Sequence, residues 1–183
     1  YTTLFRSSNC RTLFLNGLST WALENVDIDM GGATGTGDMN NYAGLWINAG
    51  TGTLKNVSVH NGGPNNGIAV ITCTRPYLEG CTVYDMNWAL TGITDDVLQG
   101  IWISSCTNPT LIGCKTYDFS GVNSGAATAF YTRGFALAGN TGLKMSDCST
   151  EDCDQGFDSS GSSGNRHFTI TRSEEHTSEL QSR

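Results

Sequence analysis

Three aspartates occupy matching places in the chain, each at the end of a short stretch of similar residues: Asp85, Asp118 and Asp152. Two carboxylates about 5 Å apart perform retaining glycoside hydrolysis, and carboxylate oxygens are also the ligands that Ca²⁺ takes. Aspartate more often caps its own turn with a hydrogen bond to the backbone. We therefore expect turn capping at all three positions, with a Ca²⁺ site as the minority alternative and no other cofactor.

Aromatic side chains are the second group that could act on a ligand. Trp46 and Trp102 lie at matching places in Gly-Leu-Trp-Ile and Gly-Ile-Trp-Ile, and Tyr84 and Tyr117 each precede one of the aspartates. Large rings with a polar atom can stack on a sugar and hydrogen-bond to it, so all four are candidate substrate-binding residues. For the tryptophans the alternative is a minor hydrophobic cluster beneath neighbouring loops. For the tyrosines a stabilising ladder is the first expectation and a ligand platform the alternative.

These residues lie in a sequence that repeats. Residues 67–85 and 100–118 are identical at ten of nineteen positions. Extending the alignment in both directions gives a first series of residues that each begin a short apolar run: Gly44, Gly67, Gly100, Gly134 and Gly156. A second series accompanies it: Leu23, Leu54, Leu78, Leu111 and Met145. Its members are 31, 24, 33 and 34 residues apart, and a period of this size indicates a solenoid.

The pattern within each repeat predicts strands rather than helices. Short runs alternate apolar and polar residues, and 23 glycines with only 15% charged residues are unusual for a helical domain. Alternation places Leu54, Val57 and Val59 inward and Lys55 and Ser58 outward. With three short strands per coil, each paired with its counterpart about 4.8 Å along the axis, equivalent residues stack in columns. The expected fold is all-β: a right-handed single-stranded parallel β-helix of about five to six coils without complete caps.

Two further columns follow from this register. One lies at a bend between the second and third strands, where a left-handed backbone suits the residue types: Asn25, Asn56, Gly80, Gly113 and Asp147. The other places Cys81, Cys114 and Cys148 in the inward column of Val26 and Val57. These cysteines are therefore expected to act as small buried apolar residues.

The other cysteines leave the redox compartment open. Cys73 and Cys106 stack in the first turn, where the spacing is compatible with a disulfide and with two free thiols. Cys10 and Cys153 have no clear partner.

The pattern resembles the right-handed parallel β-helix (pectin-lyase-like) superfamily, which contains pectate lyases, polygalacturonases and phage tailspikes, over roughly residues 10–171. The resemblance implies a polysaccharide or glycan partner on the outer face of the first strand, and an extracellular, virion or cell-surface location. In this sequence the outward column of that strand is Phe14, Trp46, Ala69, Trp102, Ala136 and Asp158. Trp46 and Trp102 would then stand two coils apart, about 10 Å, which suits alternate sugars of an extended chain.

The resemblance also implies where catalytic residues would lie. Polygalacturonase-like hydrolases carry Asp and His directly before the first strand, where this sequence has Ala43, Asn66, Gln99, Arg133 and Gln155. That departure disfavours hydrolysis of this type, although Asp95 and Asp96 lie shortly before Gly100 and within reach of the cleft. β-Helix lyases often use Arg or Lys as a base, which makes Arg133 a candidate, with Asp154 expected one coil away. A loop salt bridge is the alternative for Arg133.

Two classes of function therefore stay open. The first is a polysaccharide-binding β-helix segment, with or without lyase or glycoside hydrolase activity, whose candidate catalytic residues are Asp95, Asp96 and Arg133. The second is a non-catalytic structural or adhesive solenoid, such as a segment of a tailspike or surface adhesin. His60 is expected to be a solvated turn residue, with a general base as the alternative. The sequence has no zinc-ligand spacing, phosphate-binding glycine loop or nucleophile elbow.

The last residues, 172–183, resemble a translated sequencing adapter, and we expect the native domain to be 1–171. Without them the charge changes from −7 to 8 basic minus 14 acidic residues, or −6. An acidic chain without Lys/Arg clusters disfavours a nucleic-acid partner. The sequence contains no run of about 18 apolar residues, so we expect no membrane partner. The start at Tyr1, without Met or a signal segment, indicates a fragment of a longer protein.

Overall fold

The structure is a computed structural model. It describes residues 3–6, 11–31, 43–62, 66–90, 97–123, 131–159, 166, 169–171 and 174–176. Cys10, Asp95 and Asp96 lie outside these ranges. The described residues form strands and turns, and no helix among them is long and apolar enough to cross a membrane.

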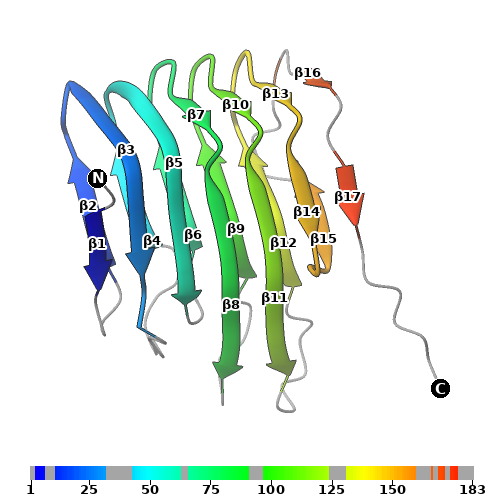
Figure 1. Cartoon of the computed structure of the whole chain (residues 1–183). Helices are drawn as coiled ribbons and strands as arrows, with labels where there is room; N and C mark the ends of the chain where they lie inside the picture. Colours follow the sequence, from blue (N-terminus) through cyan, green and yellow to red (C-terminus); the bar gives the residue numbers. More distant parts are fainter. Residues whose placement is uncertain are drawn as a thin grey trace.

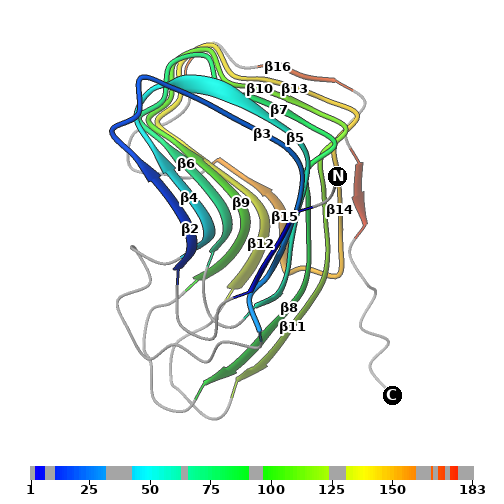
Figure 2. The same cartoon turned by 60° about the vertical axis from the view of Figure 1, so that its left-hand side comes forward.

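Six parallel strands form one sheet, which contains the first strand of each coil: β2 (Arg11–Asn16), β4 (Ala43–Asn48), β6 (Asn66–Ile71), β9 (Val97–Ser104), β12 (Tyr131–Ala138) and β15 (Gln155–Asp158). Each strand pairs with its counterpart in the next coil, in chain order. We call this the first-strand sheet, and it forms one wall of the coil in Figure 2.

An eleven-stranded parallel sheet forms the other two walls (Figures 1 and 2). The second-strand side contains β7 (Tyr77–Glu79), β10 (Thr110–Ile112), β13 (Lys144–Ser146) and β16 (Thr169–Thr171). The third-strand side contains β8 (Thr82–Leu90), β11 (Lys115–Asn123), β14 (Ser149–Glu151) and β17 (Glu174–His176). Two longer strands, β3 (Thr20–Asp29) and β5 (Thr51–Gly62), run along both walls, because β5 pairs with β7 and then with β8. β1 (Thr3–Arg6) pairs with β3.

The strand register confirms the coil assignment. The second series of the sequence, from Leu23 to Met145, forms direct partners in successive strands. The all-β parallel β-helix expected from the repeats is therefore confirmed. β17 pairs with β14 although it lies in the adapter-like tail, so the non-native origin of residues 172–183 stays a prediction.

The predicted left-handed bend is also confirmed. Its five residues have φ values of 54°, 50°, 60°, 59° and 55°, in the order Asn25, Asn56, Gly80, Gly113 and Asp147. The asparagine amides add a contact along the axis, because Asn56 Nδ2 donates to Asn25 Oδ1 at 3.0 Å. Residues that tolerate this conformation are thus required at the bend of each of these coils.

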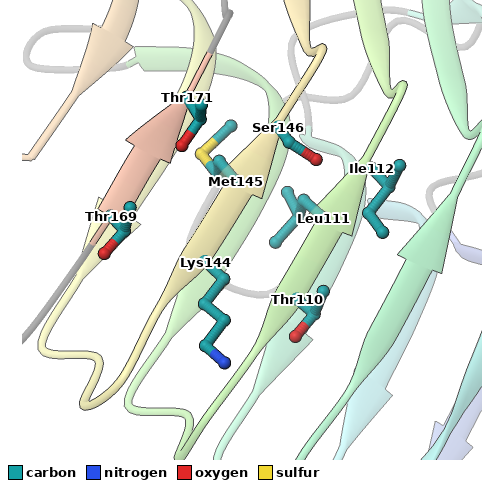
Figure 3. A pocket seen from close by; sticks show the side chains of 8 residues that line it. All are labelled: Thr110, Leu111, Ile112, Lys144, Met145, Ser146, Thr169 and Thr171. Atoms are coloured by element: carbon teal, nitrogen blue, oxygen red, sulfur yellow. The ribbon is translucent and has the colours of Figure 1, made fainter.

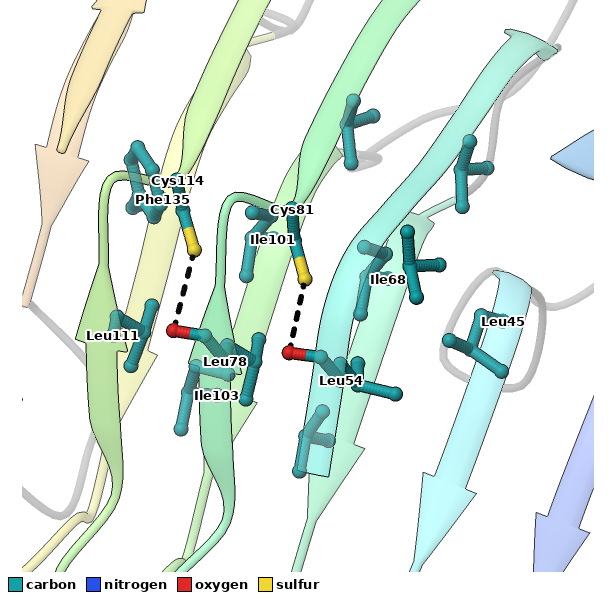
Figure 4. Packing of buried hydrophobic residues seen from close by; sticks show 14 of the residues in the cluster. Leu45, Leu54, Ile68, Leu78, Cys81, Ile101, Ile103, Leu111, Cys114 and Phe135 are labelled. Atoms are coloured by element: carbon teal, nitrogen blue, oxygen red, sulfur yellow. Dashed lines mark hydrogen bonds between the residues drawn. The ribbon is translucent and has the colours of Figure 1, made fainter. Parts of the chain in front are cut away.

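The core is a stack of inward side chains from all three walls, several of them fully buried. Figure 4 shows Leu54, Leu78 and Leu111 opposite residues of the first-strand sheet such as Ile101 and Phe135. Burying one such side chain contributes about 1.5–3 kcal/mol. Stacking of equivalent residues therefore makes one continuous core along the axis.

The cysteine column lies in this core, as predicted. Cys81, Cys114 and Cys148 are buried, and none of them forms a disulfide. The thiol of Cys81 donates to the Leu54 carbonyl at 3.7 Å, and that of Cys114 donates to the Leu78 carbonyl at 3.7 Å (Figure 4). Hydrogen bonds with the neighbouring thiols, together with burial, raise the pKa of Cys114. A raised pKa keeps this thiol protonated and unreactive.

The turn between the first and second strands of a coil contains a second column of stacked polar residues, made of Cys73, Cys106 and Asn140. Both cysteines are free in the structure, so the disulfide alternative is not formed. Cys73 N donates to Cys106 Sγ at 3.4 Å, and Cys106 N donates to Asn140 Oδ1 at 3.0 Å. Toward the preceding coil, Cys106 Sγ donates to the Val70 carbonyl at 3.4 Å and Asn140 Nδ2 to the Ile103 carbonyl at 2.8 Å. The thiol and the amide therefore play the same hydrogen-bonding role in successive coils.

We expect the six described cysteines to resist modification in the folded protein. All six are buried, and a reagent reaches a core thiol only after a coil opens, which costs several kcal/mol. A thiol reagent should thus modify them on the order of 100-fold or more slowly than in denaturant. The rate of thiol modification, resolved by peptide mass spectrometry, measures this. Fast labelling of Cys114 in the folded chain would contradict its place in the core.

Candidate functional site

The outer face of the first-strand sheet has the register that the sequence predicts. Phe14, Trp46, Ala69, Trp102, Ala136 and Asp158 are direct partners in successive strands. The residues directly before each strand glycine form the neighbouring column, in which Arg133 pairs with Gln99 on one side and Gln155 on the other. Side chains from two adjacent columns therefore meet on this face.

The two tryptophans contact each other, which corrects their expected spacing. Their ring centroids are 5.9 Å apart in an edge-to-face arrangement, instead of about 10 Å. Both indoles pack with Ala69, whose short side chain leaves room between them, in a small cluster outside the main core. Edge-to-face packing is favourable for aromatic rings. The pair therefore does not form two separate surfaces for stacking on sugars at alternate coils.

Phe14, Trp46 and Trp102 form an aromatic row on this face, and the three rings differ in exposure. Phe14 is 42% exposed, and its ring centroid lies 6.4 Å from that of Trp46. Trp46 is only 8% exposed, whereas Trp102 is partly exposed. Burial of Trp46 agrees with the hydrophobic-cluster alternative for this residue. Trp102 has the ring surface that a ligand can reach.

Arg133 forms an ion pair on the same face. Its Nε lies 2.8 Å from Asp158 Oδ2 and also donates to Gln155 Oε1 at 3.1 Å. The side chains of Arg133 and Asp158 are 23% and 11% exposed. The salt-bridge alternative for Arg133 is thus the one observed. It joins two strands of the sheet, β12 and β15.

Asp154, the partner expected for Arg133, has a different role. Its Oδ2 accepts hydrogen bonds from Thr132 N at 2.7 Å and from Thr132 Oγ1 at 3.0 Å, and Asp154 N donates to that hydroxyl at 2.8 Å. The expectation of an Arg133–Asp154 pair was wrong, because the carboxylate satisfies the backbone and hydroxyl of the preceding coil. This reciprocal pair holds the start of β15 against β12, beside the ion pair.

One small residue separates the aromatic row from the ion pair. Ala136 lies between Trp102 and Asp158 in the column and is only 4% exposed. Arg133 lies on the same strand, three residues earlier. A ligand on this part of the face would contact the indole of Trp102 on one side and the ion pair on the other. Guanidinium and carboxylate groups offer donors and acceptors to neighbouring hydroxyls.

The third-strand side bears the predicted aromatic ladder, with one additional member. Tyr84 and Tyr117 stack with centroids 5.2 Å apart and an angle of 7° between ring planes. His60 stacks on the other face of Tyr84 at 4.9 Å and 12°. Both faces of Tyr84 are therefore covered, which leaves its ring edge for any ligand. The stabilising-ladder expectation is confirmed.

His60 is more than the solvated turn residue expected. Its Nε2 lies 3.3 Å from Asp27 Oδ1, and the Ser58 hydroxyl donates to the same carboxylate oxygen. The sequence contained a signal for this cluster, since Asp27 and Ser58 are partners in neighbouring strands and His60 lies two residues after Ser58. The carboxylate lies between serine and histidine, so the three do not form a nucleophilic triad.

Ionisation of Tyr84 should destabilise the fold at high pH. Burial, with the nearby carboxylate of Asp27 next in effect, raises the pKa of Tyr84 above its usual value near 10. The folded state thus holds the phenol proton more tightly than the unfolded state. Its contribution is complete below the unfolded pKa and is lost as the pH rises through the folded pKa. The free energy of unfolding should fall above about pH 10, and Tyr84→Phe should remove part of that fall.

Denaturant titrations from pH 8 to 11 test this expectation, with spectrophotometric titration of the phenols alongside. A Tyr84 phenol that ionises at or below its ordinary value in the folded chain would contradict it.

The three aspartates share a left-handed backbone conformation. Asp85, Asp118 and Asp152 are exposed and have φ values of 50°, 58° and 51°. In two coils the third strand does not end at the aspartate, because β8 and β11 continue to Leu90 and Asn123 (Figure 1). Turn capping by these carboxylates stays a prediction. Within the described ranges, no group of three or more His, Cys, Asp or Glu is placed to hold a metal ion. The Ca²⁺ site stays a minority prediction.

Of the candidate site residues, the structure brings Trp46, Trp102 and Arg133 to one face and puts Tyr84 and Tyr117 on another. Asp95 and Asp96 lie outside the described residues. Asp158 and Gln155, which contact Arg133, were not singled out from the sequence. The sequence feature that could have indicated these two residues is their place in the outward columns.

Comparison with known proteins gives one family match. Residues 9–174 match the family described as the right-handed β-helix region. A solved structure of a candidate glycosyl hydrolase from Parabacteroides merdae ATCC 43184 is similar over 94% of this chain and 82% of that chain, with a TM-score of 0.43 and 13% sequence identity. No curated protein is significantly similar in sequence. The geometry of the outer face of the first-strand sheet is therefore the basis for a functional proposal.

Proposed function

Because the chain belongs to the right-handed β-helix family, we propose that the outer face of its first-strand sheet binds polysaccharide. The observation that carries the proposal is the placement of the partly exposed ring of Trp102 and the Arg133–Asp158 ion pair on one face, with Ala136 between them in the column. Polysaccharide chemistry, common in the superfamily that the sequence resembles, agrees with such a face.

The chemistry of this part of the face suits a sugar ring. An aromatic ring provides apolar contact with the ring carbons of a sugar, and the ion pair provides charged donors and acceptors for its hydroxyls. Because the charges of Arg133 and Asp158 balance each other, the ion pair adds no net charge to this part of the face. A neutral sugar unit is therefore the best match for this subsite.

We place binding above catalysis. Arg133 Nε is engaged by Asp158 and Gln155, and Asp154 is engaged by Thr132. A lyase or hydrolase role for Arg133, Asp95 and Asp96 stays a proposal of second rank. Incubation with acidic and neutral polysaccharides, followed by unsaturated-product absorbance and reducing ends, decides it. Binding without either product would rule out the enzyme for those substrates.

A structural or adhesive solenoid is the second candidate function. The observation that favours it is the burial of Trp46 in a small cluster on the face that would bind sugar. If that cluster only stabilises the coil, then replacing Trp102 should lower stability without any change in a glycan interaction.

Replacing Trp102 with alanine should weaken polysaccharide binding about tenfold or more, the equivalent of about 1.4 kcal/mol, because the stacking surface is lost. Trp102→Phe should retain part of the affinity. Leu18→Ala is the matched control, since Leu18 is 43% exposed and apolar but lies in the turn after β2. Isothermal titration calorimetry with neutral and acidic oligosaccharides gives the affinities, and urea titrations show whether each variant folds. Equal loss in Trp102→Ala and Leu18→Ala would contradict the proposed subsite.

A further inference from the structure

A hollow of about 290 Å³ lies over the second-strand side, on a different wall from the first-strand sheet. It spans three neighbouring strands, β10, β13 and β16, as Figure 3 shows. Its lining consists of Thr110, Leu111, Ile112, Lys144, Met145, Ser146, Thr169 and Thr171. This volume is near the lower end of the range of about 300–1,000 Å³ that small-molecule pockets have, which indicates a small ligand.

The short side chain of Ser146 accounts for the hollow. In the register, Ser146 lies between Ile112 in the preceding coil and Thr171 in the next. Both neighbours have larger side chains than serine. Beneath them Leu111 and Met145 belong to the main core and are 0% and 2% exposed, so the floor is formed by a packed part of the fold.

The polar lining consists of hydroxyl groups and one cation. Thr110, Lys144 and Thr169 are direct partners across the three strands. Lys144 is exposed and makes no ion pair with any residue in the described ranges. Its ammonium group is therefore available to a ligand, with hydroxyl groups in the coil before and the coil after.

The lining of the hollow contains no Asp or Glu, although two carboxylates border it. Asp147 follows Ser146 directly, and Glu79, whose carboxylate lies 3.4 Å from the Lys55 ammonium, is the strand partner of Ile112. Lys144 is therefore the one charged side chain among the lining residues, and it is the group that attracts an anion.

We propose that this hollow binds a small polyol that carries one anionic group. Lys144 pairs with the anionic group, a carboxylate or a phosphate ester, since an ammonium group pairs with either. The serine and threonine hydroxyls hydrogen-bond to the hydroxyls of the ligand, and Ile112 packs against its carbon chain. The site is separate from the first-strand face and does not rest on polysaccharide binding there.

Titration of the ¹⁵N-labelled chain with three probes tests the chemistry. Gluconate carries a carboxylate, glycerol 3-phosphate carries a phosphate ester, and sorbitol is a neutral polyol. We expect saturable shifts of the Ser146, Lys144 and Thr169 amides with at least one anionic probe, and affinity for sorbitol at least about tenfold weaker. The anionic probe that binds more tightly identifies the anionic group. Absence of saturable shifts with both anionic probes, or equal affinity for sorbitol, would overturn the proposal.

Two lysine variants separate a site from general charge. Lys144→Gln should weaken binding of the anionic probe about tenfold or more. Lys115→Gln is the matched control, since Lys115 is equally an exposed strand lysine but lies on the third-strand side. Ser146→Leu should fill the hollow and abolish binding, and its amide spectrum reports whether the fold is kept. Equal losses in the two lysine variants, or full binding by a folded Ser146→Leu chain, would overturn the proposal.

Discussion

Replacing Phe135 with alanine is expected to lower the free energy of unfolding by about 4 kcal/mol. Phe135 is fully buried in the core, and its ring stacks on that of Phe157 with centroids 5.1 Å apart and 9° between the planes. Truncation removes apolar contact and leaves a cavity between two coils that cannot close without shifting both. Figure 4 shows the ring among the labelled residues of the core.

Urea unfolding followed by circular dichroism measures this loss. Phe14→Ala is the matched control, because Phe14 is an aromatic strand residue of the same sheet but is 42% exposed; it should cost no more than about 1 kcal/mol. Similar losses in the two variants would show that the inward and outward columns are assigned wrongly.

Replacing Gly100 with alanine is expected to cost about 3 kcal/mol, the upper part of the usual range for overpacking. An added Cβ would lie 2.7 Å from the Gly134 carbonyl oxygen and 2.7 Å from Phe119 Cζ. The carbonyl belongs to the backbone of the next coil and cannot move aside alone. Gly67 and Gly134 have the same close approach, each to the carbonyl of the glycine one coil on, at 2.8 Å. This contact explains the first glycine series in the sequence.

Gly113→Asn is the matched control for Gly100→Ala. An added Cβ at Gly113 has no atom within 4 Å, and its φ of 59° is one that asparagine adopts at Asn25 and Asn56 in the same column. Its effect on the free energy of unfolding should stay within about 0.5 kcal/mol. The same urea titrations compare the two variants, and a Gly100→Ala chain as stable as Gly113→Asn would contradict the close approach of the coils.

Features that recur in successive coils could be predicted from the sequence. The bend column and the inward cysteines each repeat a residue type at a fixed place, and the alternation of faces along a strand then gives the outward column of the first-strand sheet. Repetition in a solenoid fixes the register, and the register fixes which residues are neighbours. Positions of the backbone and the face of each side chain were therefore predictable from residues such as Asn56, Cys114 and Trp102.

Features that depend on the direction of one side chain could not be predicted in this way. The indoles of Trp46 and Trp102 lean toward each other over Ala69, and Arg133 turns to Asp158 rather than to Asp154. Register gives only the positions of the Cα atoms, whereas long side chains choose among several rotamers. The chosen contact depends on the partners within reach.

The most direct test of the proposed binding face uses the indole N–H signals of the ¹⁵N-labelled chain. Titrated with neutral and acidic oligosaccharides, Trp102 should show the largest shift of its indole signal, while Trp21, which is in the main core, should not move. The Arg133 Nε–H signal should shift together with that of Trp102. No shift at Trp102 with any of the oligosaccharides, or shifts confined to the Tyr84 and Tyr117 ladder, would contradict polysaccharide binding on the first-strand face.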